Sequence, residues 1–235
     1  MAEVMNPMND EEKCANGLWY YTTFEGREEE HENCDDLCFE YNNTRPTNLA
    51  ERERLIRKIF GKVGKNPYIE PTIQCGFGSH IEVGDNFYAN NNCVFVDPGK
   101  ITFGNDVFIG PNCGFYTAIH PLNYKYRNML IERAEPITVG DNVWFGGSCV
   151  VLPGVTIGSN VVIGAGSVVT KDIPSGVVAF GNPCRVIREI GEGDGPEIAA
   201  QLHISRSYVS RIEKSALDKL KEALTEALGE CDVVL

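Results

Sequence analysis

Apolar residues recur every sixth position through the C-terminal half of this chain. Small or branched residues stand four positions after them, and glycine follows directly in most hexads. Residues at the first position of successive hexads are Val139, Phe145, Val151, Ile157, Ile163 and Val169. A hexad repeat of this kind predicts one short strand and one turn per six residues, with three hexads closing one triangular coil. No coil can bury its apolar face alone, so coils must stack.

An earlier block, residues 83–115, follows the same pattern with one two-residue insertion at the turn DPGK. The aliphatic positions are expected to point into the prism, and glycine and asparagine suit its strained corners. The main alternative is a β-sandwich, which would show alternating side chains with turns roughly every 8–12 residues. The uninterrupted hexads argue against it.

The two ends of the chain have a different character. Residues 10–62 are charged and show helical spacing, with an apolar stripe at residues 55–60 and Asn48 as a plausible N-cap, which predicts two or three helices. After residue 190, GEGDG reads as a linker, and Pro196 suits the first turn of a further helix. We therefore predict a helical domain at 1–65, a repeat domain at 66–190 and a helical tail at 191–235.

Composition limits the function classes. Lys and Arg number 21 against 33 Asp and Glu, a net charge of −12 that argues against a protein bound to DNA or to an anionic membrane. The acidic start lacks the apolar core of a signal peptide, and the nine cysteines show no paired framework. We expect a cytoplasmic protein with reduced thiols. His31, Cys34 and Cys38 could share a helix face but lack a fourth ligand, so no metal is expected.

Five segments of the repeat region resemble, in order, those of maltose and galactoside O-acetyltransferases of the hexapeptide-repeat acyltransferase class. They read GDNFYANNNCVFVD, TAIHP, PITVGDNVWFGG, LPGVTIGSNVVIGAGSVVTKDIP and GNPCRVIREI. The resemblance covers about residues 12–190. It implies a mainly β fold, a left-handed parallel β-helix with an N-terminal helical domain and, here, a C-terminal helical extension. It also implies acetyl transfer from acetyl-CoA to a sugar hydroxyl, without a metal, in a homotrimer with sites between subunits.

The implied chemistry needs a base and an oxyanion donor. A sugar hydroxyl is a poor nucleophile near neutral pH, and histidine is the side chain whose pKa suits removal of its proton. His120, in TAIHP, matches the catalytic base of the family, and Glu132 in the loop 116–138 could orient a partner. Asn90 matches the residue that donates to the oxyanion.

The resemblance also implies a coenzyme site along the later coils. Gly147 and Ala165 are small and would let the pantetheine arm approach, while basic residues suit the phosphates at the nucleotide end. The matched cofactor-binding positions are Asn90, Trp144, Gly147, Ala165, Thr170, Lys171, Arg185 and Arg188. Trp144 could equally pack in the core or between subunits.

The acceptor side departs from the family pattern. Tyr88 and Asp97 match positions near the sugar pocket. Tyr21 stands where a sugar-binding Asp is expected, Gly76 where the family has Asp or Ser, and Pro98 replaces the second Asp of a V-D-D motif. We infer acetyl transfer with a non-standard or poorly bound acceptor. Acetylation of an amine or xenobiotic on the same scaffold is the alternative.

The tail resembles the helix–turn–helix of sigma-factor region 4. Residues 205–221 carry five Lys or Arg against two acids, but residues 222–235 carry four acids and no base. A basic helix could face a phosphate backbone. The charge reversal and a missing supporting helix favour a structural helix or a fusion remnant over a DNA-linked regulatory role.

Overall fold

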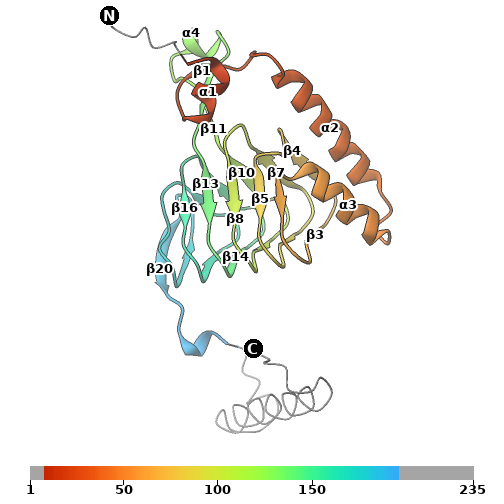
Figure 1. Ribbon diagram of the computed structural model, residues 1–235. Helices are drawn as coiled ribbons and strands as arrows, with labels where there is room; N and C mark the ends of the chain where they lie inside the picture. The colour runs from red at the N-terminus through yellow and green to blue at the C-terminus, as the bar shows by residue number, and fades with distance from the viewer. Residues whose placement is uncertain (1–7, 196–235) are drawn as a thin grey trace, which may run out of the picture. The chain divides into compact units, whose positions relative to one another are not determined.

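The structure is a computed structural model and describes residues 8–195. Between residues 62 and 189 the chain winds into stacked coils whose strands form three sheets, in the parallel β-helix arrangement predicted from the hexads (Figure 1). Each coil visits the three sheets in turn, and we name these the β2, β3 and β4 faces after their first strands. Pairing between coils is parallel, for example Ile81 with Ile101 and Ile101 with Ile137.

The strands are short, and their bounds follow the turn spacing. The β2 face contains β2 (Lys62–Val63), β5 (Ile81–Val83), β8 (Ile101–Phe103), β13 (Ile137–Val139) and β16 (Thr156–Ile157). The β3 face contains β3 (Tyr68–Ile69), β6 (Tyr88–Ala89), β9 (Phe108–Ile109), β14 (Val143–Phe145), β17 (Val161–Ile163), β19 (Val177–Phe180) and the antiparallel β20 (Arg185–Glu189). The β4 face contains β4 (Ile73–Cys75), β7 (Cys93–Val96), β10 (Gly114–Tyr116), β15 (Val150–Val151) and β18 (Val168–Val169).

The core lies inside the prism. All six first-position hexad residues named above are buried, from Val139 to Val169. Aromatic side chains fill the earlier coils, where Phe115 packs on Phe95, Phe103 and Phe145 with ring centroids 5.0–5.5 Å apart. Corner residues adopt the left-handed conformation that asparagine tolerates, as at Asn92 (φ 61°) and Asn112 (φ 59°).

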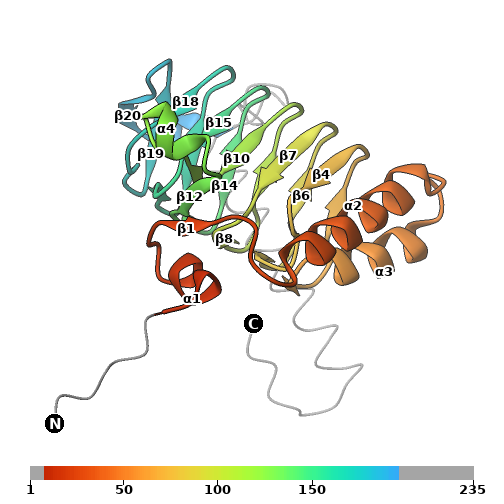
Figure 2. The same cartoon turned by 90° about the horizontal axis from the view of Figure 1, so that it is seen from above.

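Three helices in the described part of the chain precede the coils, and the second and third cover the first end of the coils (Figure 1). They are α1 (Asp10–Ala15), α2 (Arg27–Asn43) and α3 (Leu49–Ile59). Figures 1 and 2 show α2 and α3 lying against the end of the β-helix that begins with β3 and β4. The Asn42 side chain of α2 donates to the Ile73 carbonyl and accepts from the Ile73 N–H. These bonds cover backbone groups at the open edge of strand β4. The Asn48 side chain caps α3, as predicted.

One segment leaves the coils between β10 and β13. It forms β11 (Ala118–Ile119), α4 (Tyr124–Arg127) and β12 (Ile131–Ala134), and β12 also pairs with β1 (Tyr20–Tyr21) near the N-terminus. The small antiparallel sheet β1–β12–β11 therefore stands outside the prism.

The chain divides into two compact units, Met1–Ile190 and Gly191–Leu235. Of the second unit the structure describes residues 191–195, which include the 3-10 helix η1 (Glu192–Asp194). The predicted helical tail lies beyond residue 195, outside the described residues. Among residues 8–195, no helix has the length and apolar character needed to cross a membrane.

Candidate active site

The small sheet outside the prism positions His120 against a carboxylate. Antiparallel pairing places Ala118 opposite Ala134 and Tyr20 opposite Glu132, while His120 follows directly after β11. The His120 Nε2 atom lies 3.7 Å from Glu132 Oε2, and the Tyr20 hydroxyl donates a hydrogen bond to Glu132 Oε1. Three side chains from three separate segments thus form one hydrogen-bonded and ionic chain.

Burial increases steadily along this chain. The side chain of His120 is 54% exposed and that of Glu132 is 12% exposed, while Tyr20 is fully buried. Burial and the adjacent carboxylate raise the pKa of the Tyr20 phenol above its usual range, so it remains a hydrogen-bond donor. A carboxylate fixed in this way can orient the imidazole and stabilise its protonated form.

Tyr20 is a site residue that the sequence did not reveal. The predicted acceptor residue was its neighbour Tyr21, which pairs with Ile131 and has an exposed side chain. Successive strand residues point to opposite sides, so only one of the two tyrosines can reach Glu132. One general rule could have pointed to Tyr20: a buried tyrosine hydroxyl usually has a hydrogen-bond partner.

Glu132 also forms a wall of a cavity of about 460 Å³. Phe24, Arg27, Gly76, Phe77 and Pro98 are among its other lining residues, and we call this cavity the Glu132 pocket. Gly76 and Pro98, two positions where the acceptor motif is altered, therefore line it together. Tyr88 lies elsewhere, on the β3 face, and is not among the described residues that line the pocket.

Asp97 lies behind the wall of the pocket rather than in its lining. Its side chain is completely buried, and its carboxylate accepts hydrogen bonds from the N–H groups of Gly76, Phe77 and Gly78 at 2.7–2.9 Å. Burial raises the pKa of the Asp97 carboxyl, while these hydrogen bonds oppose that change. An acceptor cannot reach this carboxylate in the present geometry. Asp97 instead holds the turn that forms the pocket wall.

Predicted coenzyme residues gather along the corner between the β3 and β4 faces. The corners of successive coils are joined by backbone hydrogen bonds from Asn112 to Asn91, from Ser148 to Pro111 and from Gly166 to Gly147. Asn90, Gly147 and Ala165 therefore lie on one ridge. Asn90 Oδ1 accepts from the Asn91 N–H, which leaves the amide nitrogen as a donor without a partner in the described residues.

Other predicted coenzyme residues lie at the opposite edge of the β4 face. Thr170 and Lys171 follow β18 there, and His120 belongs to the segment that leaves the coils from this same edge. The β4 face is about 13 Å wide along the strand direction, because its strand β7 has four residues with a rise of about 3.3 Å each. Within one chain, the structure therefore does not bring His120 and Asn90 together.

The remaining predicted residues are exposed. Arg185 and Arg188 lie on β20, which is exposed along its whole length at the end of the β3 face. Trp144 (56% exposed) belongs to a vertical stripe on the β3 face with Tyr68, Tyr88 and Phe108, in which the rings of Tyr68 and Tyr88 stack at 6.0 Å. This stripe is an apolar surface of the single chain.

Comparisons with known proteins agree with this architecture. A family model described as the maltose acetyltransferase hexapeptide capping motif matches residues 13–64, and one for the bacterial transferase hexapeptide, six repeats, matches 136–171. A model for sigma-70, region 4, matches residues 196–222.

Relatives of known name align over most of the chain. Galactoside O-acetyltransferase of Escherichia coli K12 is 44% identical over 183 residues, 78% of this chain and 90% of the relative. The crystal structure of a maltose O-acetyltransferase from Clostridium difficile 630 is 49% identical with a TM-score of 0.77, covering 80% of this chain and all of that one. A galactoside acetyltransferase in complex with coenzyme A is 44% identical with a TM-score of 0.78, covering 80% and 94%.

The 44% identity to the galactoside O-acetyltransferase covers nine-tenths of that protein, and the two family models match both the N-terminal helices and the coils. The chain therefore belongs to the maltose and galactoside O-acetyltransferase family of hexapeptide-repeat acetyltransferases.

Proposed function

We propose that this protein transfers an acetyl group from acetyl-CoA to a hydroxyl of a sugar or glycoside, with His120 as general base. The observation that carries the proposal is the chain His120–Glu132–Tyr20 beside the Glu132 pocket. An imidazole that is half exposed and faces a buried carboxylate can meet an acceptor and also hold a proton.

The reaction proceeds by direct attack. The acceptor hydroxyl oxygen forms a bond to the thioester carbon as His120 removes its proton, and Glu132 stabilises the imidazolium that results. The Asn90 amide nitrogen donates to the oxyanion of the tetrahedral intermediate. Collapse of the intermediate breaks the carbon–sulfur bond, and the imidazolium returns its proton to the CoA sulfur.

This mechanism requires more than one copy of the chain. His120 and Asn90 lie at opposite edges of the β4 face, so they meet only where one edge of a copy faces the other edge of a neighbour. A closed ring of three copies satisfies both edges of every chain. We propose a homotrimer with sites between subunits.

Coenzyme A fits the same arrangement. The small residues Gly147 and Ala165 leave backbone groups of the ridge open to the pantetheine arm. A larger residue at 147 would be crowded, because a Cβ there would lie 3.3 Å from the Pro111 carbonyl oxygen. Thr170 and Lys171 would come from the neighbouring edge. Arg185 and Arg188 on β20 would bind phosphates at the nucleotide end.

The test is incubation with acetyl-CoA and a panel of sugars, glycosides and amines while thiol release is followed. Turnover with hydroxyl acceptors supports the proposal. If only amine acceptors react, the altered acceptor positions Gly76 and Pro98 reflect a change to N-acetylation, and the sugar assignment is wrong.

A further inference from the structure

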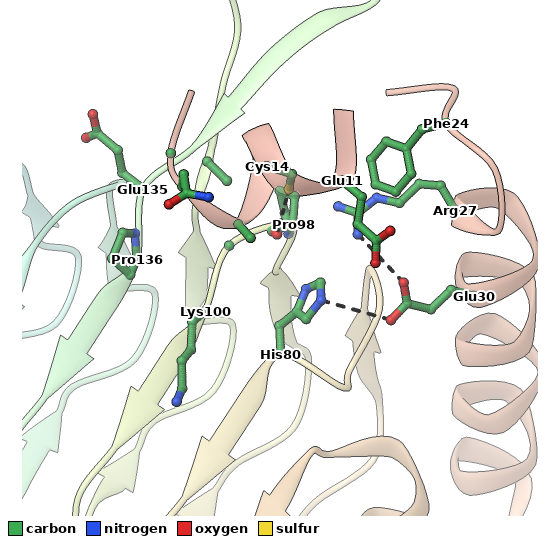
Figure 3. Close-up of a pocket in the computed structure, with 15 residues that line it drawn as sticks. Glu11, Cys14, Phe24, Arg27, Glu30, His80, Pro98, Lys100, Glu135 and Pro136 are labelled. Carbon is green, nitrogen blue, oxygen red and sulfur yellow. Dashed lines mark hydrogen bonds and ion pairs between the residues drawn. The ribbon is translucent and has the colours of Figure 1, made fainter. Parts of the chain in front are cut away.

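A second cavity, of about 690 Å³, lies beside the Glu132 pocket, between α1, α2 and the turn at Pro98. The two cavities share Phe24, Arg27 and Pro98 as lining residues. Figure 3 shows the Arg27 side chain extending from α2 toward Glu11 of α1, between Phe24 and Glu30. Arg27 thus belongs to the partition that separates a pocket beside His120 from a larger space.

Arg27 is held rigidly in this partition. Its residue is 8% exposed, and its Cζ atom lies 3.5 Å from the centre of the Phe77 ring and 5.3 Å from that of Phe24. Two aromatic contacts fix the plane of the guanidinium and favour its charge. The position of the cation therefore does not depend on a ligand.

The guanidinium is incompletely satisfied. One terminal nitrogen lies 3.7 Å from Glu30 Oε2, beyond hydrogen-bond distance, and the other is buried without a partner in the described part of the chain. The Oε1 atom of Glu30 is already engaged, because Ser79 Oγ donates to it at 2.6 Å and His80 Nε2 lies 4.0 Å from it, and Oε2 is the atom that pairs with Arg27 by charge alone. A buried cationic donor without a partner is unfavourable, because it has lost its hydrogen bonds to water, and a ligand that supplies an acceptor removes this cost.

Neighbouring groups point to an anion as that partner. α2 begins at Gly26 without a side-chain cap, and its N-terminus adds partial positive charge next to Arg27. The acidic residues that face the two cavities have other partners: Glu132 accepts from Tyr20, and Glu135 pairs with Arg133 at 2.7 Å. Glu11 also lines the larger cavity and Glu28 the Glu132 pocket.

We propose that the acceptor carries an oxyanion, a carboxylate or a phosphate, and that Arg27 binds this group in the partition while the reacting hydroxyl faces His120. The inference rests on the proposed acetyl transfer and specifies its acceptor class. A planar guanidinium with a free edge can bind either group through charge-assisted hydrogen bonds. Discrimination against neutral sugars follows, because they bring no charge to the Arg27 terminal nitrogen that has no partner in the described part of the chain.

The first experiment uses the intact wild-type protein. Rates of thiol release are measured with glucose, glucuronate and glucose 6-phosphate as acceptors. We expect kcat/KM at least about 10-fold higher for one or both anionic sugars. The glucuronate and phosphate arms distinguish the two sources of the oxyanion. Equal or better turnover of glucose overturns the inference but leaves sugar acetylation intact, whereas no turnover of any hydroxyl acceptor removes the proposed function itself.

The second experiment tests Arg27 directly. Arg27→Gln should lower kcat/KM for the favoured anionic sugar roughly 10- to 100-fold and change that for glucose less than about 2-fold. The matched control is Arg54→Gln on α3, an exposed arginine paired with Glu51, which should change neither value. An equal loss with neutral and anionic sugars would mean that Arg27 only supports the fold.

A third measurement needs no variant, in case Arg27→Gln fails to fold. Inorganic phosphate should inhibit the wild-type enzyme competitively against the acceptor, because both bind the partition. Competition against acetyl-CoA alone places the anion at the coenzyme phosphates and overturns the inference.

Discussion

His120 depends on a carboxylate that is itself held in place. Glu132 is almost buried and receives a hydrogen bond from Tyr20, whose hydroxyl has no access to solvent. Displacement of the carboxylate would leave the imidazole without its orienting partner. If His120 is the general base, its orientation depends on Tyr20, a residue 100 positions earlier in the chain.

Removal of the imidazole should affect chemistry more than coenzyme binding. We predict that His120→Ala lowers kcat at least about 100-fold, because the proposed mechanism relies on the imidazole to accept the hydroxyl proton, while the KM for acetyl-CoA changes little. Steady-state assays of thiol release measure both constants. An unchanged rate would exclude His120 from the mechanism.

Removal of the Tyr20 hydroxyl should weaken catalysis without unfolding the protein. We predict that Tyr20→Phe lowers kcat about 3- to 30-fold, since a hydrogen bond to a carboxylate contributes about 1.5–3 kcal/mol and only part of that is used in orientation. The pH profile of kcat separates this role from a purely structural one, since only an orienting role predicts that it shifts. Tyr124→Phe, an exposed tyrosine of α4, is the control and should retain full activity.

Residues of the site differ in how far the sequence predicts them. His120 lies in the short motif TAIHP, and the resemblance of this motif to the family's predicts that His120 is the base. Asp97 also lies in a motif. Its carboxylate accepts from three backbone N–H groups, and only the folded turn at Gly76 shows this. Arg27 belongs to no motif, and its importance comes from the two cavities that the fold places beside it.

Among the elements, the coils are the part that the sequence determines best. One hexad corresponds to one side of the prism, so a period of six predicts both the strands and the direction of each side chain. The segment between β10 and β13 has no period, and its pairing with β1 joins residues far apart in the sequence. Local patterns carry no information about such a contact.

The aromatic filling of the early coils should dominate their stability. Phe115 is fully buried against three other rings, so we predict that Phe115→Ala lowers the free energy of unfolding by about 3–5 kcal/mol. Denaturant unfolding followed by circular dichroism measures it. Phe39→Ala, which truncates an exposed ring of α2, should change the value by less than about 0.5 kcal/mol.

At the scale of the whole molecule, the proposed site is divided between the two edges of the β4 face, with His120 at one edge and Asn90 at the other. We predict that inactive His120→Ala and Asn90→Ala chains restore each other when mixed and reassembled. With random mixing, a quarter of the interfaces pair an intact His120 with an intact Asn90, so activity should reach about a quarter of the wild-type value. If the site lies within one chain, mixing restores nothing beyond the average of the two variants.

The tail adds a separate segment to this assembly. Its residues 196–222 match the sigma-70 region 4 model, whereas the acetyltransferase matches end before it. We predict that deletion after Ile190 leaves kcat and both KM values unchanged, because no proposed site residue lies beyond it. Salt-sensitive DNA binding by the full chain, lost on deletion, would assign the tail a regulatory role.

If the site forms between copies, as proposed, the separation of His120 and Asn90 makes turnover depend on the abundance of the protein. In the proposed ring, a lone chain has both edges and no complete centre, so turnover per chain would decline once the protein is diluted below the point at which rings come apart. Scarcity alone would then silence the enzyme, with no inhibitor and no change in any residue. A damaged copy would also harm its neighbours, since each defective edge removes a centre that a healthy chain needs.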